Sequence, residues 1–300
     1  MAACLLTSDE CVLKNVPQIS DVETMASLLR QVGAKVSNID GSTIKISAKN
    51  IKPTPLPSEL TAKLRASVLM LGPMLARAGK VEIGYPGGDI IGRRPIETHI
   101  QALESLGAKV EKNNVSYSAS AQKRLSGTEI FLEEASVTAT ENAIMAASTA
   151  EGLTIIKRAA SEPHVVDLCN FLNSMGAQIS GIGSNVLTIN GVEKLYGTTY
   201  SISPDHIEVG TFAILAAVAG GKIEMSPIEI KDLDMVLLTL SKFKVDYAVN
   251  GDTLIVKKSN LQAVEKVVTD VWPGLPTDLI APIIVLATQA KGISLLHDWM

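Results

Sequence analysis

The segment Ala102-Leu-Glu-Ser-Leu-Gly107-Ala-Lys-Val110, followed by Val115-Ser-Tyr-Ser118, carries the pattern that decides the fold. Its first half has apolar residues at three- and four-residue steps, which is typical of an amphipathic helix. Gly107 is expected to end that helix, because glycine adopts the left-handed conformation of a helix C-terminus at little steric cost. The remainder alternates apolar and polar residues, which predicts short strands. The segment therefore predicts a helix followed by two strands.

The same design occurs in three further segments, spaced by about seventy residues. They are Leu28–Ile46, Phe171–Ile189 and Leu238–Val256. In the last of them Lys244 stands where the others have glycine, so we expect a cap that is weaker or built differently. A repeat of this length is much longer than a solenoid repeat and predicts a larger supersecondary unit.

Other helices are expected between these units. The run Thr61–Ala78 has leucine and valine residues on one face, and Gly72-Pro73 is expected to kink it. Ala139–Glu151 and Thr211–Ala219 are rich in small helix-forming residues. Each full repeat then has two helices and several strands, which predicts an α/β protein with a repeated βα architecture.

Composition excludes several classes of function. The chain has 300 residues and a net charge of −4, so no overall positive field favours nucleic acid. No apolar run approaches the roughly 20 residues of a membrane-spanning helix, so we expect no membrane insertion. The three cysteines are scattered and no pair has metal-ligand spacing, which predicts no metal site, no disulfide framework and a reducing cytoplasm. The chain begins inside an apolar, helix-like run and ends just after an apolar, strand-like stretch, so we expect it to be a longer protein truncated at both ends.

The loop Pro86-Gly87-Gly88-Asp89-Ile90-Ile91-Gly92-Arg93-Arg94-Pro95 is the first candidate site. Adjacent glycines let a backbone turn sharply and approach a ligand closely. Asp89 and two arginines beside it suit an anionic substrate that needs a proton moved. A solvated surface turn with an ordinary ion pair is the alternative for this loop taken alone.

Two helix starts are further candidates. Thr138 with Glu141 fits a capping box, and the hydroxyls of Ser136 and Thr138 beside free N–H groups suit a phosphate, although plain capping is the alternative. Asp278 stands at the start of a later apolar helix, where the helix dipole favours a carboxylate, and capping by Asp278 or Thr277 is again the alternative.

Taken together, six stretches resemble the UDP-N-acetylglucosamine enolpyruvyl transferases. They lie in the family's order along nearly the whole chain. The related shikimate-pathway enolpyruvyl transferases share the repeat but fit these motifs poorly. The stretches are Leu64-Arg-Ala-Ser with Leu71-Gly-Pro and Ala76-Arg77, Pro86–Pro95, Ala139-Thr-Glu-Asn142, Ser161-Glu-Pro163, Pro204-Asp-His-Ile-Glu208 and Leu275-Pro-Thr-Asp278.

The resemblance implies an inside-out α/β barrel of the enolpyruvyl transferase type, with two domains built from repeated βαβαββ units. Helices lie at the centre of each domain, which accounts for a sequence rich in alanine and poor in aromatic residues. The active site of the family lies between the domains. Residues 1–203 are expected to form one domain without its N-terminal edge, and residues 204–300 part of the second.

The resemblance also implies roles for individual residues. Asp278 matches the base that takes the proton of the sugar 3′-hydroxyl, and Asp89 matches a general acid that is often cysteine. Thr138 replaces a glycine that is usual in the family, and His206 and His164 replace residues that are commonly arginine and glutamate. The family's Lys-Asn pair and its later phosphate-binding arginines have no counterpart in the chain. The substrate-binding positions are Arg65, Arg94, Pro95, Ile96, Glu97, Thr98, Ser136, Val137, Thr138 and Met300.

The activity implied is transfer of the enolpyruvyl group of phosphoenolpyruvate to UDP-N-acetylglucosamine, the first committed step of peptidoglycan synthesis, without a cofactor. Fosfomycin inhibits the family by alkylating the loop cysteine, so Asp89 implies resistance to it. The alternative is an inactive paralogue that binds a sugar nucleotide without catalysis. An in-frame Lys-Asn pair upstream and an arginine-bearing segment downstream would favour the enzyme.

Overall fold

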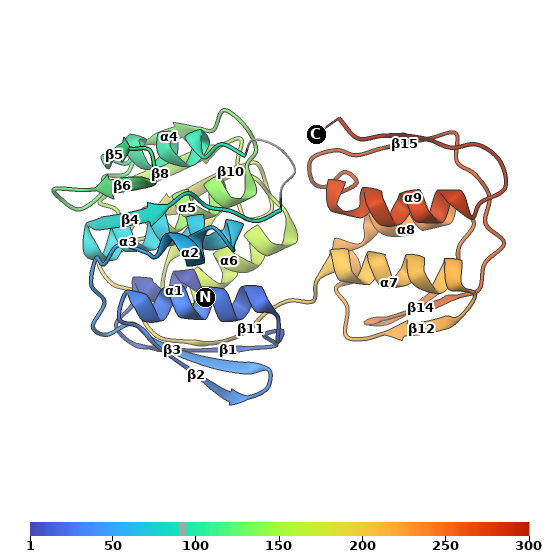
Figure 1. Cartoon of the computed structure of the whole chain (residues 1–300), viewed down its shortest axis with the longest axis horizontal. Coiled ribbons are helices and arrows are strands. Elements are labelled where there is room, and N and C mark those ends of the chain that lie inside the picture. The colour runs from blue at the N-terminus through green and yellow to red at the C-terminus, as the bar shows by residue number, and fades with distance from the viewer. Residues whose placement is uncertain (90–93, 300) are drawn as a thin grey trace. The chain divides into compact units, whose positions relative to one another are not determined.

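The chain forms two compact units, each with a hydrophobic core of its own. The computed structural model describes residues 1–89 and 94–299. The first unit comprises Met1–Ile202 and the second comprises Ser203–Met300 (Figure 1). The assignment of 1–203 as one enolpyruvyl transferase domain and of 204–300 as part of another stays a prediction.

Four copies of one motif, a strand, a helix and two further strands, make up most of the chain (Figure 1). In every copy the last strand lies between the other two and is antiparallel to both. The predicted repeat is therefore confirmed. The copies are β1 (Glu10–Lys14), α1 (Ser20–Gln31), β2 (Lys35–Asp40) and β3 (Thr43–Ser47); β4 (Lys80–Gly84), α4 (Glu97–Ser105), β5 (Lys109–Lys112) and β6 (Ser116–Ser120); β8 (Leu153–Lys157), α6 (Pro163–Ser174), β9 (Gln178–Ser180) and β10 (Val186–Asn190); and β12 (Lys222–Met225), α8 (Asp234–Lys242), β13 (Asp246–Asn250) and β14 (Thr253–Lys257).

The turn after each helix is the same in all four copies. Gly33, Gly107 and Gly176 have φ of +94°, +94° and +99°, as the glycine pattern predicts. Lys244 takes the same left-handed conformation with φ of +61°, and its N–H donates to the Ser241 carbonyl as the glycines donate to theirs. Of the two expected alternatives, a weaker cap or a differently built one, the structure therefore excludes only the second. The lysine carries a Cβ in a region that favours glycine, so the cap remains the weaker one.

A second helix precedes the first strand of the motifs. Parallel strands or bridges accompany these helices and complete the predicted βαβαββ unit. These elements are η1 (Ala2–Leu6), α3 (Leu71–Ala78), β7 (Glu129–Phe131), α5 (Val137–Ala147), β11 (Thr199–Ser201), α7 (His206–Ala219), β15 (Lys266–Val268), α9 (Ile280–Thr288) and β16 (Leu295–His297). Smaller helices are α2 (Ser58–Thr61), η2 (Arg65–Met70), η3 (Ile230–Asp232) and η4 (Thr277–Leu279).

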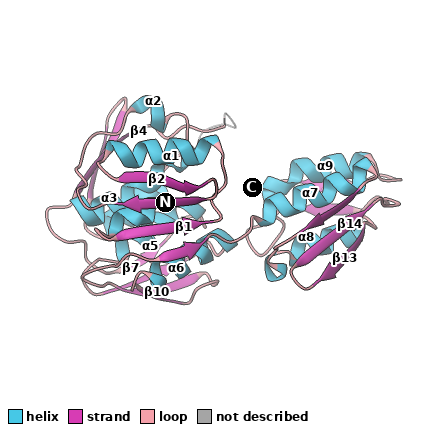
Figure 2. Ribbon diagram, turned by 90° about the horizontal axis from the view of Figure 1, so that it is seen from below, coloured by secondary structure: helices cyan, strands magenta, loops and turns pink. Residues whose placement is uncertain are grey.

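The first unit closes on itself through β11. This strand, the last of the unit, pairs in parallel with β1, the first, with Val12 opposite Thr199. Strand β11 is thus the parallel neighbour of β1 in the same way that β7 is the parallel neighbour of β8. Three sheets then surround a centre of helices (Figures 1 and 2).

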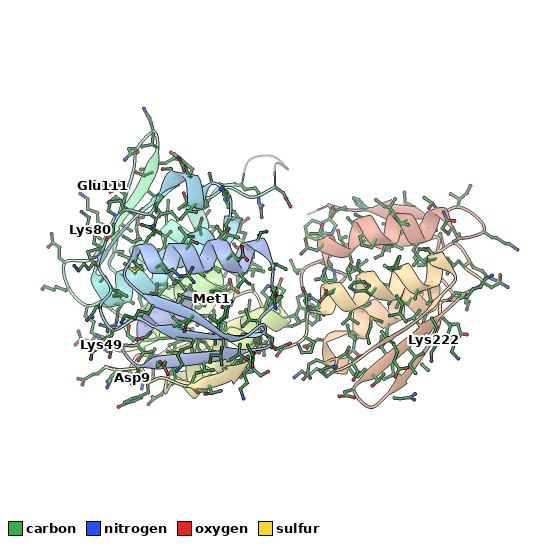
Figure 3. The ribbon with its side chains drawn as sticks, turned by 60° about the horizontal axis from the view of Figure 1, so that its bottom comes forward. Met1, Asp9, Lys49, Lys80, Glu111 and Lys222 are labelled. Atoms are coloured by element: carbon green, nitrogen blue, oxygen red, sulfur yellow. The ribbon has the colours of Figure 1, made fainter. Side chains whose placement is uncertain are left out.

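The centre of the first unit consists of helices, as the inside-out barrel requires. Helix α3 packs against both η1 and α5. Every residue of α5 from Ala139 to Ala147 is buried, on all sides of the helix. A helix buried all round needs small side chains, which explains the alanine-rich sequence. Charged side chains such as Lys80 and Glu111 project outward from the sheets (Figure 3).

The predicted kinked helix Thr61–Ala78 is wrong. The chain instead forms α2, an irregular turn, the 3-10 helix η2 and then α3. Pro73 is the third residue of α3, where its missing N–H costs no helical hydrogen bond because the first N–H groups of a helix have no partner within it. The break places Arg65 at the start of η2.

The described helices include none that is long and apolar enough to span a membrane. All three cysteines are reduced and buried. Over residues 1–89 and 94–299 no group of three or more histidine, cysteine, aspartate or glutamate side chains is arranged to hold a metal ion.

Candidate functional site

The glycine-rich loop lies directly against the turn that precedes Arg65. The N–H of Gly87 donates to the Thr61 carbonyl at 2.9 Å, and a Cβ at Gly87 would collide with the backbone of Ala62. Gly88 has φ of +100°, and a Cβ there would lie 3.0 Å from Cβ of Arg65. Both glycines are therefore required by the close approach of two backbone segments.

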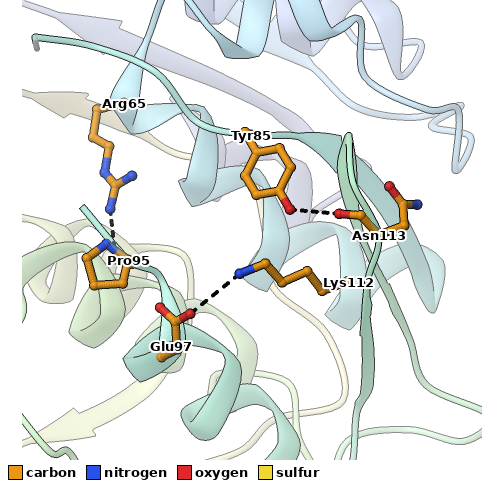
Figure 4. A network of polar contacts seen from close by, with 6 residues as sticks. All are labelled: Arg65, Tyr85, Pro95, Glu97, Lys112 and Asn113. Atoms are coloured by element: carbon orange, nitrogen blue, oxygen red, sulfur yellow. Dashed lines mark hydrogen bonds and ion pairs between the residues drawn. The ribbon is translucent and has the colours of Figure 1, made fainter. Parts of the chain in front are cut away.

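Two arginines meet beside this loop. Arg65 is half-buried, and its guanidinium donates to the Pro95 carbonyl at 3.0 Å (Figure 4). Nη1 of Arg94 lies 3.6 Å from the position a Cβ would take at Gly88. Burial lowers the pKa of Arg65, and the charge of Arg94 lowers it further. Two cations held this close favour an anion between them.

Glu97 opens α4 and faces solvent. Its carboxylate lies 3.7 Å from Nζ of Lys112, and Tyr85 beside it donates to the Asn113 carbonyl at 2.7 Å (Figure 4). The ammonium of Lys112 also lies 5.9 Å from the centre of the Tyr85 ring. Solvent screens exposed ion pairs of this kind and makes them weak, so Glu97 can exchange Lys112 for a ligand at small cost.

Thr98 links the start of α4 to the segment before α5. Its hydroxyl donates to Oε1 of Glu134 at 3.2 Å, and both Thr98 and nearby Ile96 are buried. The structure thereby brings two predicted binding segments together within the first unit, namely Arg94–Thr98 and Ser136–Thr138. The spacing along the chain does not predict that these segments lie close together; only the resemblance implied it.

Helix α5 begins with a different cap from the predicted one. Ser136 is the N-cap, and its hydroxyl accepts from the Ala139 N–H at 3.4 Å. Thr138 is already the second helical residue, and Glu141 is buried in the core, so the capping box of Thr138 with Glu141 is wrong. The cap lies two residues earlier, which leaves the Thr138 hydroxyl available for another partner.

That partner is a buried histidine. Oγ1 of Thr138 lies 3.1 Å from Nε2 of His99, and Nδ2 of Asn142 lies 2.9 Å from Nδ1 of the same ring. Asn142 also donates to the Val68 carbonyl at 3.0 Å and accepts the Gly72 N–H at 2.7 Å. Burial lowers the pKa of His99 to about 3, and Arg65 adds to the effect. The ring is therefore neutral at physiological pH.

The sequence analysis gave His99 no role and gave Asn142 none beyond a motif position. A signal was present in the composition of α5. An asparagine inside an alanine-rich apolar helix is buried, and a buried amide requires hydrogen-bond partners. Its partners come from η2, α3 and α4, elements that only the fold brings together.

The same helix carries a second polar group in the core. Burial raises the pKa of Glu141 to about 8, and nearby Glu162 acts in the same direction. Oε2 of Glu162 is itself buried and has no hydrogen-bond partner among the residues that the structure describes. Glu141 therefore holds its proton near neutral pH and lies below the helix start rather than on the exposed face.

The second unit carries Asp278. This residue is exposed and lies in η4, the 3-10 turn that leads into α9. Thr277 donates to Asp298 at 3.0 Å, and within the described part of the chain no side-chain hydrogen bond caps the start of η4 or of α9. Burial lowers the pKa of His206, while Asp205 and Asp278 oppose the shift, so Asp278 lies within electrostatic range of this histidine. Trp272 packs edge-on to the His206 ring at 5.3 Å.

Three predicted positions lie at or beyond the edge of the described residues. Asp89 is exposed and directly follows Gly88. Arg93 and Met300 lie outside the described residues, so their predicted places in the site stay predictions.

Comparison with known proteins decides the family. A family model of EPSP synthase (3-phosphoshikimate 1-carboxyvinyltransferase) matches residues 1–298. A protein of Treponema denticola named UDP-N-acetylglucosamine 1-carboxyvinyltransferase is 45% identical, over 100% of this chain and 72% of its own length. One of the same name from Borreliella burgdorferi is 43% identical, over 99% of this chain and 71% of its own length. The chain belongs to the UDP-N-acetylglucosamine 1-carboxyvinyltransferase family.

Solved structures agree with the fold of a UDP-N-acetylglucosamine 1-carboxyvinyltransferase. The enolpyruvyl transferase NikO from Streptomyces tendae superposes with a TM-score of 0.86 at 20% identity, over 99% of this chain and 72% of its own. EPSP synthase from Acinetobacter baumannii superposes with a TM-score of 0.72 at 17% identity, over 98% and 70%. The predicted enolpyruvyl transferase architecture is thereby confirmed.

Proposed function

We propose that the protein transfers the enolpyruvyl group of phosphoenolpyruvate to the 3′-hydroxyl of UDP-N-acetylglucosamine and releases phosphate. The observation that carries the proposal is identity of 40–45% across the whole chain with proteins named for this transfer. The non-catalytic alternative is not favoured by these names. The reaction is the first committed step of peptidoglycan synthesis, so the proposal includes a role in cell-wall formation, cell shape and cell division. The proposed location of the enzyme is the cytoplasm.

Binding is assigned to the first unit. Arg94–Thr98 receive the uridine end, and the start of α5 at Ser136, Val137 and Thr138 receives the diphosphate. Support comes from the contact of Thr98 with Glu134, two residues before Ser136, and from the contact of His99, next to Thr98, with Thr138. The first N–H groups of a helix have no partner within it, and together with the helix dipole they favour a phosphate.

The arginines are assigned to phosphoenolpyruvate. Arg65 and Arg94 lie close enough for the charge of one to lower the pKa of the other. An anion with several oxygens relieves that repulsion and accepts charge-assisted hydrogen bonds from both. The arginines and the helix start supply the charge stabilisation, so the proposal needs no metal and no cofactor.

The chemistry is an addition followed by an elimination. The 3′-oxygen bonds to C2 of phosphoenolpyruvate while C3 gains a proton and the hydroxyl loses one. The C2–O bond to phosphate then breaks as C3 loses a proton, which yields the enol ether and inorganic phosphate. Asp278 is the base for the hydroxyl, and Asp89 is the general acid of the loop.

A coupled assay tests the proposal. We expect phosphate release from phosphoenolpyruvate only when UDP-N-acetylglucosamine is present, and calorimetric binding of that nucleotide in preference to ADP-glucose. Equal binding of both nucleotides would contradict the assignment of the substrate. Selective binding without phosphate release would favour the non-catalytic paralogue.

A further inference from the structure

The amide of Asn142 has a single orientation. Its oxygen accepts from the Gly72 backbone N–H at 2.7 Å, and its nitrogen donates to the Val68 backbone carbonyl at 3.0 Å. A backbone N–H only donates and a backbone carbonyl only accepts, so the amide cannot be reversed. The remaining hydrogen of the amide nitrogen therefore points to the third partner, Nδ1 of His99, at 2.9 Å.

This orientation fixes the tautomer of His99. Because Nδ1 accepts a hydrogen bond from Asn142, it carries no proton. A neutral imidazole has one N–H, which then lies on Nε2 and donates to Oγ1 of Thr138 at 3.1 Å. The ring is 2% exposed, and burial keeps it neutral by lowering its pKa to about 3.

The Thr138 hydroxyl is consequently an acceptor toward His99 and has its own proton left to donate. Among residues 1–89 and 94–299, no group accepts a hydrogen bond from that proton. Thr138 is only half-buried and lies in the first turn of α5, beside the free N–H groups of the helix start. A threonine in a helix interior often donates to a carbonyl of the preceding turn, but the first turn has no such carbonyl within the helix.

We propose that His99 and Asn142 are positioning residues that hold the Thr138 hydroxyl as a hydrogen-bond donor to the diphosphate of the sugar nucleotide. The inference rests on the proposed function for the identity of the ligand. Where the family usually has glycine, this chain has a side chain whose hydroxyl joins the N–H groups of the helix start. The hydrogen-bonded series runs from Gly72 and Val68 through Asn142 and His99 to Thr138.

Paired substitutions at two positions test the series by calorimetry with UDP-N-acetylglucosamine. Thr138→Val removes the hydroxyl and is expected to raise Kd about tenfold, the value of one hydrogen bond to a charged group. Thr138→Ser keeps the hydroxyl and should bind within about twofold of the parent. Thermal unfolding monitored by circular dichroism identifies any variant that has lost the fold.

Substitutions of His99 separate positioning from packing. The amide nitrogen of glutamine occupies the place of Nε2, so His99→Gln should bind nearly as well as the parent. The amide of asparagine occupies the place of Nδ1, so His99→Asn should raise Kd by about threefold to tenfold. In the Thr138→Val background His99→Asn should add nothing, because its effect passes through that hydroxyl. The KM for phosphoenolpyruvate should stay constant in all four variants.

Nitrogen NMR of the histidine ring gives a readout that needs no ligand. We expect Nε2 of His99 to carry a proton and Nδ1 to be bare at pH 7, with no change on Thr138→Val. The opposite tautomer would overturn the inference and leave the proposed function intact, as would unchanged binding by Thr138→Val. A folded parent that binds no UDP-N-acetylglucosamine would overturn the proposed function, and this inference with it.

Discussion

Helices α5 and α9 occupy the same place in the repeat but carry opposite chemistry at their starts. Each follows one strand and precedes the strand that is parallel to it, β7 and β8 for α5, β15 and β16 for α9. The first start presents hydroxyl groups of Ser136 and Thr138, and the second presents the carboxylate of Asp278. The repeat thus fixes the place of a functional group, and one or two side chains fix what it does.

The helix dipole connects the two cases. The positive end of a helix stabilises a negative charge, whether the charge belongs to a ligand or to a side chain. At α5 the first turn holds no acidic residue, and in the proposed function the diphosphate of the ligand supplies the negative charge. At η4 the chain supplies a carboxyl group of its own in Asp278, which the proposed function uses as the general base.

The largest effect should come from removing that carboxylate. Asp278→Asn keeps the shape of the side chain but cannot take a proton, so turnover should fall by about 10²–10⁴-fold while binding of UDP-N-acetylglucosamine changes little. Steady-state kinetics and calorimetry measure the two quantities. Glu208→Gln neutralises another exposed carboxylate at a helix start and should leave turnover within about twofold. Turnover of Asp278→Asn within a few-fold of the parent would reassign Asp278 to a structural role.

Asp89 tests whether the acid comes from the first unit. Asp89→Ala should lower turnover by about 10²-fold or more, because no group remains to deliver the proton. Steady-state kinetics of phosphate release measures the change. Full activity in Asp89→Ala would remove the loop from the mechanism.

Fosfomycin sharpens the same assignment. A carboxylate is a much weaker nucleophile than a thiolate, so the parent should resist covalent inactivation. Asp89→Cys should remain active and become sensitive, which a time course of inactivation and the mass of the modified protein would record. Inactivation of the parent at the rate of Asp89→Cys would show that the position does not determine the reaction with the drug.

A smaller effect is expected at the binding side of the comparison. Arg94→Ala should raise the Kd for UDP-N-acetylglucosamine by about tenfold, since it removes charge-assisted hydrogen bonds. Lys49→Ala removes an exposed positive charge elsewhere on the first unit and is the matched control (Figure 3). Arg94→Ala binding as well as Lys49→Ala would contradict the assignment of Arg94–Thr98.

The smallest effect concerns the equivalence of the repeats themselves. Lys244 has φ of +61° where the other three copies have glycine. Lys244→Gly should raise the free energy of unfolding by about 0.5–1 kcal/mol, because it removes the strain of a left-handed backbone at a residue with a Cβ. This stabilisation exceeds the loss that comes from the greater conformational entropy of glycine in the unfolded chain. Denaturant unfolding measures the change. Gly107→Ala in the first unit should change stability in the opposite direction, and a loss of stability in Lys244→Gly would mean that the lysine has contacts that compensate its strain.

The sequence specified the repeated motif because its signals are local. Apolar spacing and a glycine at the helix end depend on neighbouring residues alone, and the structure has the predicted turn at Gly33, Gly107 and Gly176. The helix predicted for Thr61–Ala78 failed for a tertiary reason. The Ala62 backbone contacts Gly87, and Arg65 approaches Gly88, so the chain turns there instead of remaining helical.

The candidate site was less accessible to sequence reasoning. The resemblance indicated Arg65, Arg94 and the start of α5, and the structure brings Thr98 into contact with Glu134 beside that start. The predicted capping box is wrong because Thr138 contacts His99 and Glu141 lies in the core. Contacts between side chains about forty residues apart depend on packing, which spacing along the chain does not reveal.

The pairing of β11 with β1 has a consequence for how the first unit comes into being. The side chain of Asn15, next to β1, bonds to the Ile202 carbonyl across 187 residues of sequence. Contacts between such distant residues form late, because the entropy of closing a long loop is lost before the pairing contributes any stabilisation. During synthesis from the N-terminus the pairing of β1 with β11 can therefore form only after Thr199–Ser201 has left the ribosome. The strand order of this sheet thus sets the earliest point in synthesis at which the sheet can be completed.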